Sequence, residues 1–290
     1  MDRELLSPRN DFVFKKLMGD PSNVDLLADF LQSVLDLPAE EYDTLTVVDP
    51  HLSGEHPDDK LGILDVKVAT RSGKVIDVEI QVEPLPWMRE RILFYAARMV
   101  SEQARAGEPY ERIQQVASIV ITGHKLVADS GRYHHRFRLY DDAGTVLFTD
   151  KLEIHTLELP KVPLTPDKTS LWNWLRFFSA EGREDFEMAT ETSPTIARAY
   201  GVLKELSADE RTRLLAESRE KARRDEEARR KGAWLDGRNE GVEQGIAQGI
   251  EKVARNLLRS MDMSRAEVAK ATGLTLTEID RLVGESERPS

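Results

Sequence analysis

Four polar side chains interrupt an otherwise apolar stretch at residues 60–81, KLGILDVKVATRSGKVIDVEIQ: Asp65, Asp77, Glu79 and Gln81. Carboxylates within strongly β-forming segments cost free energy unless they bind something. Two carboxylates that converge with an amide or an ammonium group offer what a hard divalent cation needs. The stretch therefore predicts a site for a divalent metal ion.

The same stretch predicts a β-hairpin that would hold these side chains. Apolar residues dominate both halves, and Gly73 suits the turn between them. Because side chains alternate along a strand, residues 77, 79 and 81 share one face, and Asp65 and Lys67 share a face of the partner strand. Lys67 is thus a candidate for positive charge at the site.

The arrangement of one Asp followed about a dozen residues later by Glu-x-Gln resembles the PD-(D/E)XK nuclease core, with Gln81 where Lys is commoner. More specifically, the chain resembles the Rpn family of recombination-promoting nucleases, also described as PD-(D/E)XK nuclease family transposases. Other stretches follow in the family's order: DFVFKKLMGD at 11–20, LDV at 64–66, EIQ at 79–81, a helix with Arg91 and Tyr95, and a glycine-spaced tail from Gly237.

The resemblance implies an α/β fold, a mixed sheet flanked by helices and followed by an all-helical tail. It implies a metal-dependent DNA endonuclease in which Asp65 and Glu79 hold Mg²⁺, with Mn²⁺ as a substitute. Gln81 would orient a water or a phosphate oxygen, which carries less charge to the transition state than Lys would. Lys67 is the candidate that supplies this missing charge from the neighbouring strand.

Two further helices carry candidates for the same site. Asp11 lies at a helix start. The resemblance implies that Asp11 is an auxiliary acid of the site, and the alternative is a helix cap that pairs with Lys15 on the surface. Arg91 and Tyr95 lie four residues apart on a helix from about Trp87 to Ala106. The resemblance has them contact phosphate or the metal-bound water, and the alternative is a solvated helix edge.

Composition sets limits on the function. The formal net charge is −11, which argues against a general nucleic-acid coat but not against a nuclease. The chain has no cysteine, which excludes disulfides and thiolate metal sites. The first residues, MDRELLSPRN, show no apolar signal region, and no apolar run approaches a membrane span of about 20 residues. We therefore expect a cytoplasmic protein without membrane partners.

We expect three regions: a nuclease-like domain at 1–206, a charged helical connector at 207–236, and a tail at 237–290. In the tail, glycines recur every fourth residue from Gly237 to Gly249, followed by a small helix-turn-helix-like end too acidic for a DNA groove. We interpret the glycine row as a helical element for homodimers or higher homo-oligomers with a right-handed crossing. The alternative is a flexible linker.

The remaining patterns predict supporting structure. The aromatic stretch SLWNWLRFF at 170–178 indicates core, and Leu93, Phe94, Ala97 and Val100 are expected to pack inward from their helix. Four histidines at 124, 134, 135 and 155 are expected to be isolated and structural.

The resemblance suggests a role in recombination, mobile elements or phage-related defence, and a nuclease acting on RNA is an alternative interpretation. The rival interpretation is a catalytically weak or idle nuclease fold that serves as an interaction protein through its tail. The acidic net charge and Gln81 favour this rival, whereas Asp65 and Glu79 argue against it.

Overall fold

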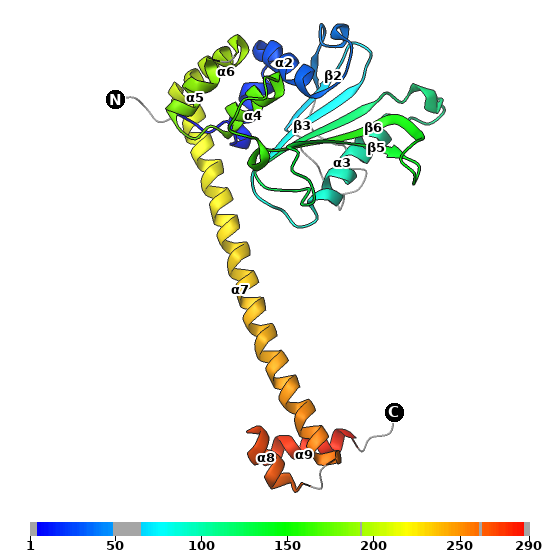
Figure 1. The fold of residues 1–290 in the computed structure, drawn as a ribbon, viewed down its shortest axis with the longest axis vertical. Helices are drawn as coiled ribbons and strands as arrows, with labels where there is room; N and C mark the ends of the chain where they lie inside the picture. The colour runs from blue at the N-terminus through cyan, green and yellow to red at the C-terminus, as the bar shows by residue number, and fades with distance from the viewer. Residues whose placement is uncertain (1–4, 49–64, 192, 261–262, 287–290) are drawn as a thin grey trace. The chain divides into compact units, whose positions relative to one another are not determined.

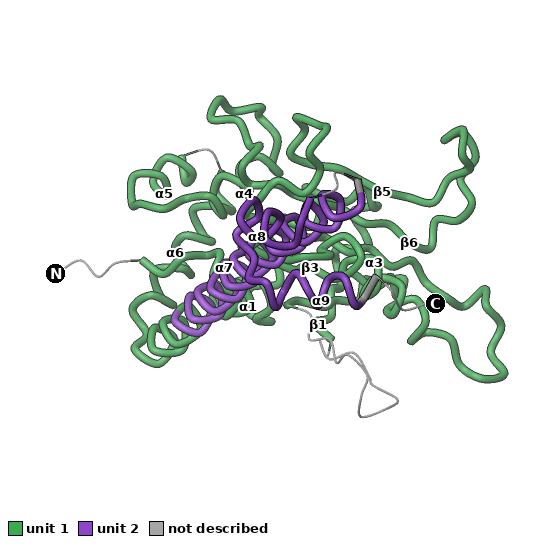
Figure 2. Tube along the Cα trace, turned by 90° about the horizontal axis from the view of Figure 1, so that it is seen from below, with its two compact units in different colours: residues 1–220 green, residues 221–290 purple. Residues whose placement is uncertain are grey.

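A mixed sheet of six strands organises residues 1–220, the first of two units in the chain (Figure 2). The structure is a computed structural model and describes residues 5–48, 65–191, 193–260 and 263–286. The strands are β1 (Thr46–Val48), β2 (Val66–Ala69), β3 (Val75–Gln81), β4 (Val116–Thr122), β5 (His134–Tyr140) and β6 (Leu147–Glu158). The helices of this unit are α1 (Asp11–Met18), α2 (Val24–Val34), α3 (Met88–Ser101), α4 (Ser170–Ser179), α5 (Arg183–Thr190) and α6 (Pro194–Ala208).

The strand order is β1-β2-β3-β4-β6-β5. Strands β1 to β3 pair antiparallel, β3-β4 and β4-β6 pair parallel, and β5 closes one edge antiparallel to β6. The α/β fold with a mixed sheet flanked by helices is thereby confirmed. The expected first hairpin strand begins before β2, and its residues 60–64 lie outside the described residues.

Helices cover both faces of this sheet (Figure 1). Helices α1, α2 and α4–α6 share one large core with the apolar residues of β2, β3 and β4. Its centre is aromatic: Phe30 packs edge-on to Trp174 at 5.8 Å between ring centroids, and Phe178 stacks on Trp174 at 5.7 Å. Trp174 and Phe178 are fully buried, which confirms that the aromatic stretch of α4 is core.

Helix α3 covers the opposite face, and its orientation differs from the expected one. Leu93 and Phe94 are 52% and 46% exposed, whereas Ile92 and Tyr95 are buried against β4. The predicted inward face was wrong: the buried face of α3 is turned from it by about 100°, the rotation between successive residues of a helix. Tyr95 turns inward because its ring fills the space beside Met99 and the start of β4, with its hydroxyl near Arg91.

The β2–β3 turn has the residues that its geometry requires. Gly73 adopts a φ of 84°, a left-handed conformation that residues with a Cβ rarely adopt. The carboxylate of Glu41 accepts hydrogen bonds from the Thr70 hydroxyl at 2.6 Å and the Ser72 amide at 3.1 Å. These contacts fix the register of the strand pair, with Lys67 opposite Asp77 and Val66 opposite Val78.

The second unit, residues 221–290, is helical. Its first element is the continuation of α7 (Glu210–Ser260), a helix of 51 residues that begins in the first unit and includes the glycine row. Helices α8 (Arg265–Thr272) and α9 (Leu276–Ser286) pack on the end of α7 around Ala254, Val268, Ile279 and Leu282. Among the described helices, none combines the length and the apolar character that crossing a bilayer requires.

Candidate functional site

Asp65 lies immediately before β2, on the sheet face that α3 covers. Its side chain is only 12% exposed. Its Oδ2 accepts a hydrogen bond from the Ile80 amide at 3.0 Å, which continues the β2–β3 pairing beyond Val66. Its Oδ1 lies 3.3 Å from the ammonium group of Lys15, on α1. Burial, with a smaller contribution from Glu79, raises the pKa of Asp65 to about 6 against the lowering effects of the Ile80 amide and Lys15.

Glu79 is the second carboxylate and lies on the same face. Its side chain is 11% exposed, and its Oε1 lies 3.3 Å from the Arg91 guanidinium. The same guanidinium donates to the Tyr95 hydroxyl at 3.3 Å and sits over the Tyr95 ring at 4.7 Å. Helix α3 therefore brings Arg91 to Glu79, with Tyr95 beside Arg91, because buried Ile92 and Tyr95 fix which side of the helix faces the sheet.

A third carboxylate, Asp77, belongs to the same face; it was expected to share a strand face with Glu79 but was assigned no role in the site. It is 1% exposed, and its Oδ1 has no hydrogen-bond partner among the described residues. Burial, then the charges of Glu79 and Asp65, raise its pKa well above the ordinary value. The strand alternation that placed residues 77, 79 and 81 on one face was the signal that could have identified it.

The other candidates occupy different positions around these carboxylates. Gln81 donates from its amide to the Glu83 carbonyl at 2.9 Å. Lys67 lies on the site face but its ammonium group is 3.7 Å from Glu102. Asp11 accepts from the neighbouring Phe12 amide at 2.8 Å, next to Asn10, which caps α1.

Lys15 was also missed as a site residue. In the sequence it is visible as a partner for Asp11, four residues before it, and as part of the stretch DFVFKKLMGD that carries the family resemblance. Once α1 packs on the core, however, the cation next to Asp65 comes from Lys15. Nothing in the spacing of residues 11–20 relates this side chain to residue 65, so only the packing of α1 beside the sheet could identify it.

The donor set fits a small divalent cation. Both ion pairs of the site measure 3.3 Å, longer than the 2.7–2.9 Å or so of a close charge-assisted hydrogen bond. Three carboxylates face one region, and one buried oxygen of Asp77 has no partner. Within the described ranges, no three His, Cys, Asp or Glu side chains lie close enough to form a complete metal site. A cation held by Asp65 and Glu79 would therefore keep several other ligands, as Mg²⁺ usually does.

The raised pKa of Asp65 predicts that the free energy of unfolding falls as the pH rises from about 4 to 7. A carboxyl whose folded-state pKa of about 6 exceeds its usual 3.8 contributes its full stability below pH 3.8 and loses it as the pH rises through 6. In the presence of a chelator, Asp65→Asn should therefore be more stable than the wild type at pH 7, by up to about 3 kcal/mol. Urea denaturation at pH 4, 5.5 and 7 measures this difference, which should shrink towards pH 4.

The matched control is Asp142→Asn, since Asp142 is an exposed turn residue. It should leave the free energy of unfolding within about 0.5 kcal/mol of the wild type, as surface substitutions usually do. We expect the wild type to be less stable than Asp65→Asn at pH 7. If the wild type is equally stable or more stable, burial of the charged Asp65 carboxylate does not cost the folded chain stability.

Three of the four histidines are not isolated, contrary to the expectation, and His135 Nδ1 lies 3.4 Å from Glu158. The ring nitrogens of His134 and His155 lie 2.9 Å apart, and His155 Nε2 is 3.4 Å from the buried Glu153. Arg136 donates two hydrogen bonds to the same carboxylate, at 2.9 and 2.7 Å. Register places this cluster on the sheet face opposite Glu79. It joins β5 to β6 and is separate from the candidate site.

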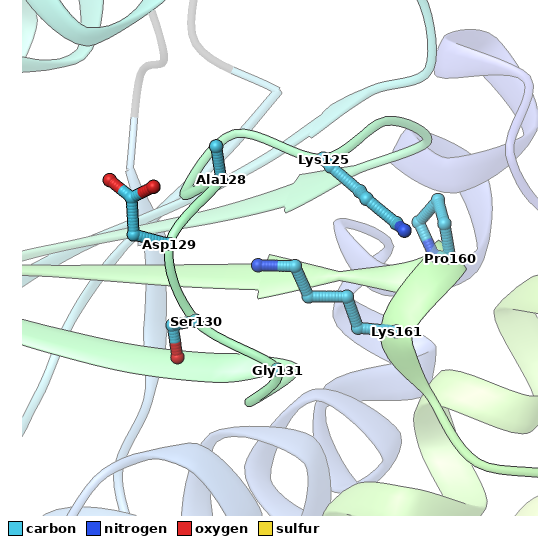
Figure 3. Close-up of a pocket in the computed structure, with 7 residues that line it drawn as sticks. All are labelled: Lys125, Ala128, Asp129, Ser130, Gly131, Pro160 and Lys161. Atoms are coloured by element: carbon cyan, nitrogen blue, oxygen red, sulfur yellow. The ribbon is translucent and has the colours of Figure 1, made fainter.

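A cavity of about 410 Å³ lies beside the β6 end, and Figure 3 shows the ammonium groups of Lys125 and Lys161 reaching into it. Lys161 lies 2.7 Å from the fully buried Glu158, and Asp129 also lines the cavity. Two cations are thus balanced by two carboxylates, which gives the cavity little net charge to attract an anion. None of the candidate site residues is among the described residues that line it.

Comparison with known proteins is consistent with this geometry. The family model described as PD-(D/E)XK nuclease family transposase matches residues 8–233. No curated protein and no solved structure matched the chain. The matched range includes the sheet, Asp65, Glu79, Gln81 and the helices that carry Lys15 and Arg91, and family membership suggests a nuclease or transposase-like function. The chain belongs to the PD-(D/E)XK nuclease family transposases.

Proposed function

We propose that the chain is a metal-dependent endonuclease that hydrolyses phosphodiester bonds in DNA. The observation that carries the proposal is the pair of nearly buried carboxylates, Asp65 and Glu79, on neighbouring strands of one sheet face. Each is compensated by a cation from a helix, Lys15 or Arg91, at a distance that leaves the carboxylate available to another ligand. Carboxylates so costly to bury are expected to serve binding or catalysis.

Asp65 and Glu79 would hold the metal, Mg²⁺ with Mn²⁺ as a substitute, which when bound supplies an activated water and offsets charge on the leaving oxygen. Of Lys15, Lys67 and Gln81, Lys15 is the side chain whose cation lies next to Asp65, at 3.3 Å, whereas Lys67 lies opposite Asp77 with its ammonium group 3.7 Å from Glu102. We assign to Lys15 the charge that a lysine would provide at position 81. Arg91 is placed to hold a substrate phosphate, since a guanidinium matches phosphate oxygens.

The test of this function is the nicking of supercoiled plasmid by the purified full chain. We expect nicked and linear DNA with Mg²⁺ or Mn²⁺ and intact plasmid with chelator. Single-stranded DNA and RNA tested in parallel identify the preferred nucleic acid. Cleavage that persists in chelator, or cleavage of RNA alone, would contradict the proposal.

A second function is favoured by one observation: the amide of Gln81 is bound to the Glu83 carbonyl and Lys67 is paired with Glu102. With both side chains engaged, the fold would act as a catalytically weak or idle interaction protein. The absence of cleavage on every substrate, with metal binding retained, would favour this function. Our assignment of the charge to Lys15 is the reason for preferring the nuclease.

A further inference from the structure

The middle of α7 has an apolar stripe that is exposed to solvent. Leu235, Val242, Ile246 and Val253 are between 41% and 59% exposed. Their spacings of seven, four and seven residues place them on one side of a helix. Beyond the stripe, Ala254, Leu257 and Leu258 pack against α8 and α9, so the stripe ends where the small core of the second unit begins.

The spacing of the stripe fits a two-stranded coiled coil. Taking Leu235 and Val242 as d positions of a heptad makes Ile246 and Val253 a positions. Branched Ile and Val at a positions combined with Leu at d positions favour pairs of helices in parallel assemblies, and Leu235 is the d residue of this stripe that meets that condition. Asn239 also falls at an a position, where a buried polar residue fixes register at some cost in stability. Of the four glycines in the row, only Gly249 falls in this stripe. The heptad pattern therefore favours helix contact along the apolar stripe, and not along the glycine row as expected from the sequence.

The charges that flank the stripe decide the orientation of a second helix. One flank carries acids, Asp236 and Glu243, at the e positions. The other flank carries bases, Lys231 and Arg238, at the g positions. All four are exposed. In a parallel pair each g residue faces the e residue five places later on the other helix, which sets Lys231 against Asp236 and Arg238 against Glu243.

An antiparallel pair would have the opposite electrostatics. There, e positions face e positions and g positions face g positions, so acids would meet acids and bases would meet bases. Like charges across an interface are unfavourable and serve to reject the wrong arrangement. We propose that the full chain forms a parallel, in-register homodimer through the stripe Leu235–Val253 of α7, with a second copy of this chain as the partner.

The orientation has a consequence for the nuclease, and that consequence rests on the proposed function. Each chain enters the helix pair from the first unit, since α7 begins there at Glu210. Two parallel chains therefore join the pair at the same end, and one dimer would carry two sites built from Asp65 and Glu79. A site for each strand is what double-strand cleavage requires.

Cysteine cross-linking tests the dimer without relying on cleavage. The chain has no cysteine, so single substitutions report one contact each. Leu235→Cys and Val242→Cys should each give a disulfide-linked dimer on mild oxidation, because in-register helices bring each d position next to its own copy. An antiparallel pair has a single crossing centre, so at most one of the two residues could meet itself. Gln244→Cys, at an exposed f position, is the control and should remain uncross-linked.

Charge reversal supplies the second arm, measured as the mass of the full chain by light scattering over a concentration series. Arg238→Glu and Glu243→Arg should each raise the dimer dissociation constant about tenfold or more, and the double variant should restore it. The inference would be overturned by a monomer at all concentrations, or by cross-links that form only in a mixture of the two cysteine variants. Because none of these measurements uses cleavage, an inactive nuclease that dimerises and an active nuclease that does not are distinguishable.

Discussion

Replacing Glu79 by Gln is expected to lower the rate of metal-dependent plasmid nicking by about 10³-fold, because a bound cation supplies several kcal/mol of charge stabilisation and this variant loses one of its charged ligands. Asp65→Asn should have an effect of the same size. Both substitutions keep the shape of the side chain, and an amide oxygen can still accept from the Ile80 amide or the Arg91 guanidinium. A loss of activity would therefore reflect lost charge at the site.

The matched control is Glu90→Gln on α3, which removes the same charge from an exposed residue one position before Arg91. It should cleave like the wild type. Lys15→Met should fall between the two, with a reduced turnover, since it removes the nearby cation and leaves both carboxylates. Cleavage by Glu79→Gln and Asp65→Asn at the wild-type rate would remove the hairpin from the mechanism, and an unimpaired Lys15→Met would refute its assigned role.

Trp174→Ala is expected to destabilise the first unit by about 3–5 kcal/mol, the range for truncating a large buried aromatic side chain. Trp174 is fully buried between Phe30 and Phe178. Its indole nitrogen also donates to the Asp29 carboxylate at 2.6 Å, which joins α4 to α2. The substitution leaves a cavity and removes the shortest of the hydrogen bonds that Asp29 accepts. Urea denaturation followed by circular dichroism measures the change.

Trp234→Ala is the control for this prediction. Trp234 lies on α7, is 62% exposed and stacks only loosely under Arg238 at 5.6 Å. Its removal should change the free energy of unfolding by less than about 0.5 kcal/mol, as surface substitutions usually do. Equal losses in the two variants would show that the aromatic cluster of α4 does not determine the stability of the unit.

Several features of the fold could be predicted from sequence because they depend on local chemistry. Alternation in β3 placed residues 77, 79 and 81 on one face, and Gly73 marked the turn whose left-handed conformation it adopts. The aromatic stretch of α4 is core, because so many large rings can be buried only in the interior. The order of the motifs along the chain predicted the family, and the match of the family model to residues 8–233 confirms it.

Helix faces were harder to predict. The face of α3 was misassigned because its apolar residues are spread over most of its circumference. Periodicity alone therefore did not identify the buried side, which the packing of Tyr95 and Ile92 on β4 determines. The pairing of His134 with His155 follows from the antiparallel register of β5 and β6, which no local pattern contains.

For the candidate site, too, some features could be predicted from sequence and others depend on tertiary packing. Sequence by itself singled out Asp65 and Glu79 as carboxylates of the candidate site, because they stand out as charges within apolar strands, and it predicted that Arg91 and Tyr95 share a helix face. Only the tertiary structure decided which cations meet these carboxylates. Lys15 reaches Asp65 from α1, and Lys67 turns to Glu102. Long side chains choose partners by distance in space, and that distance depends on how helices far apart in the sequence pack on the sheet.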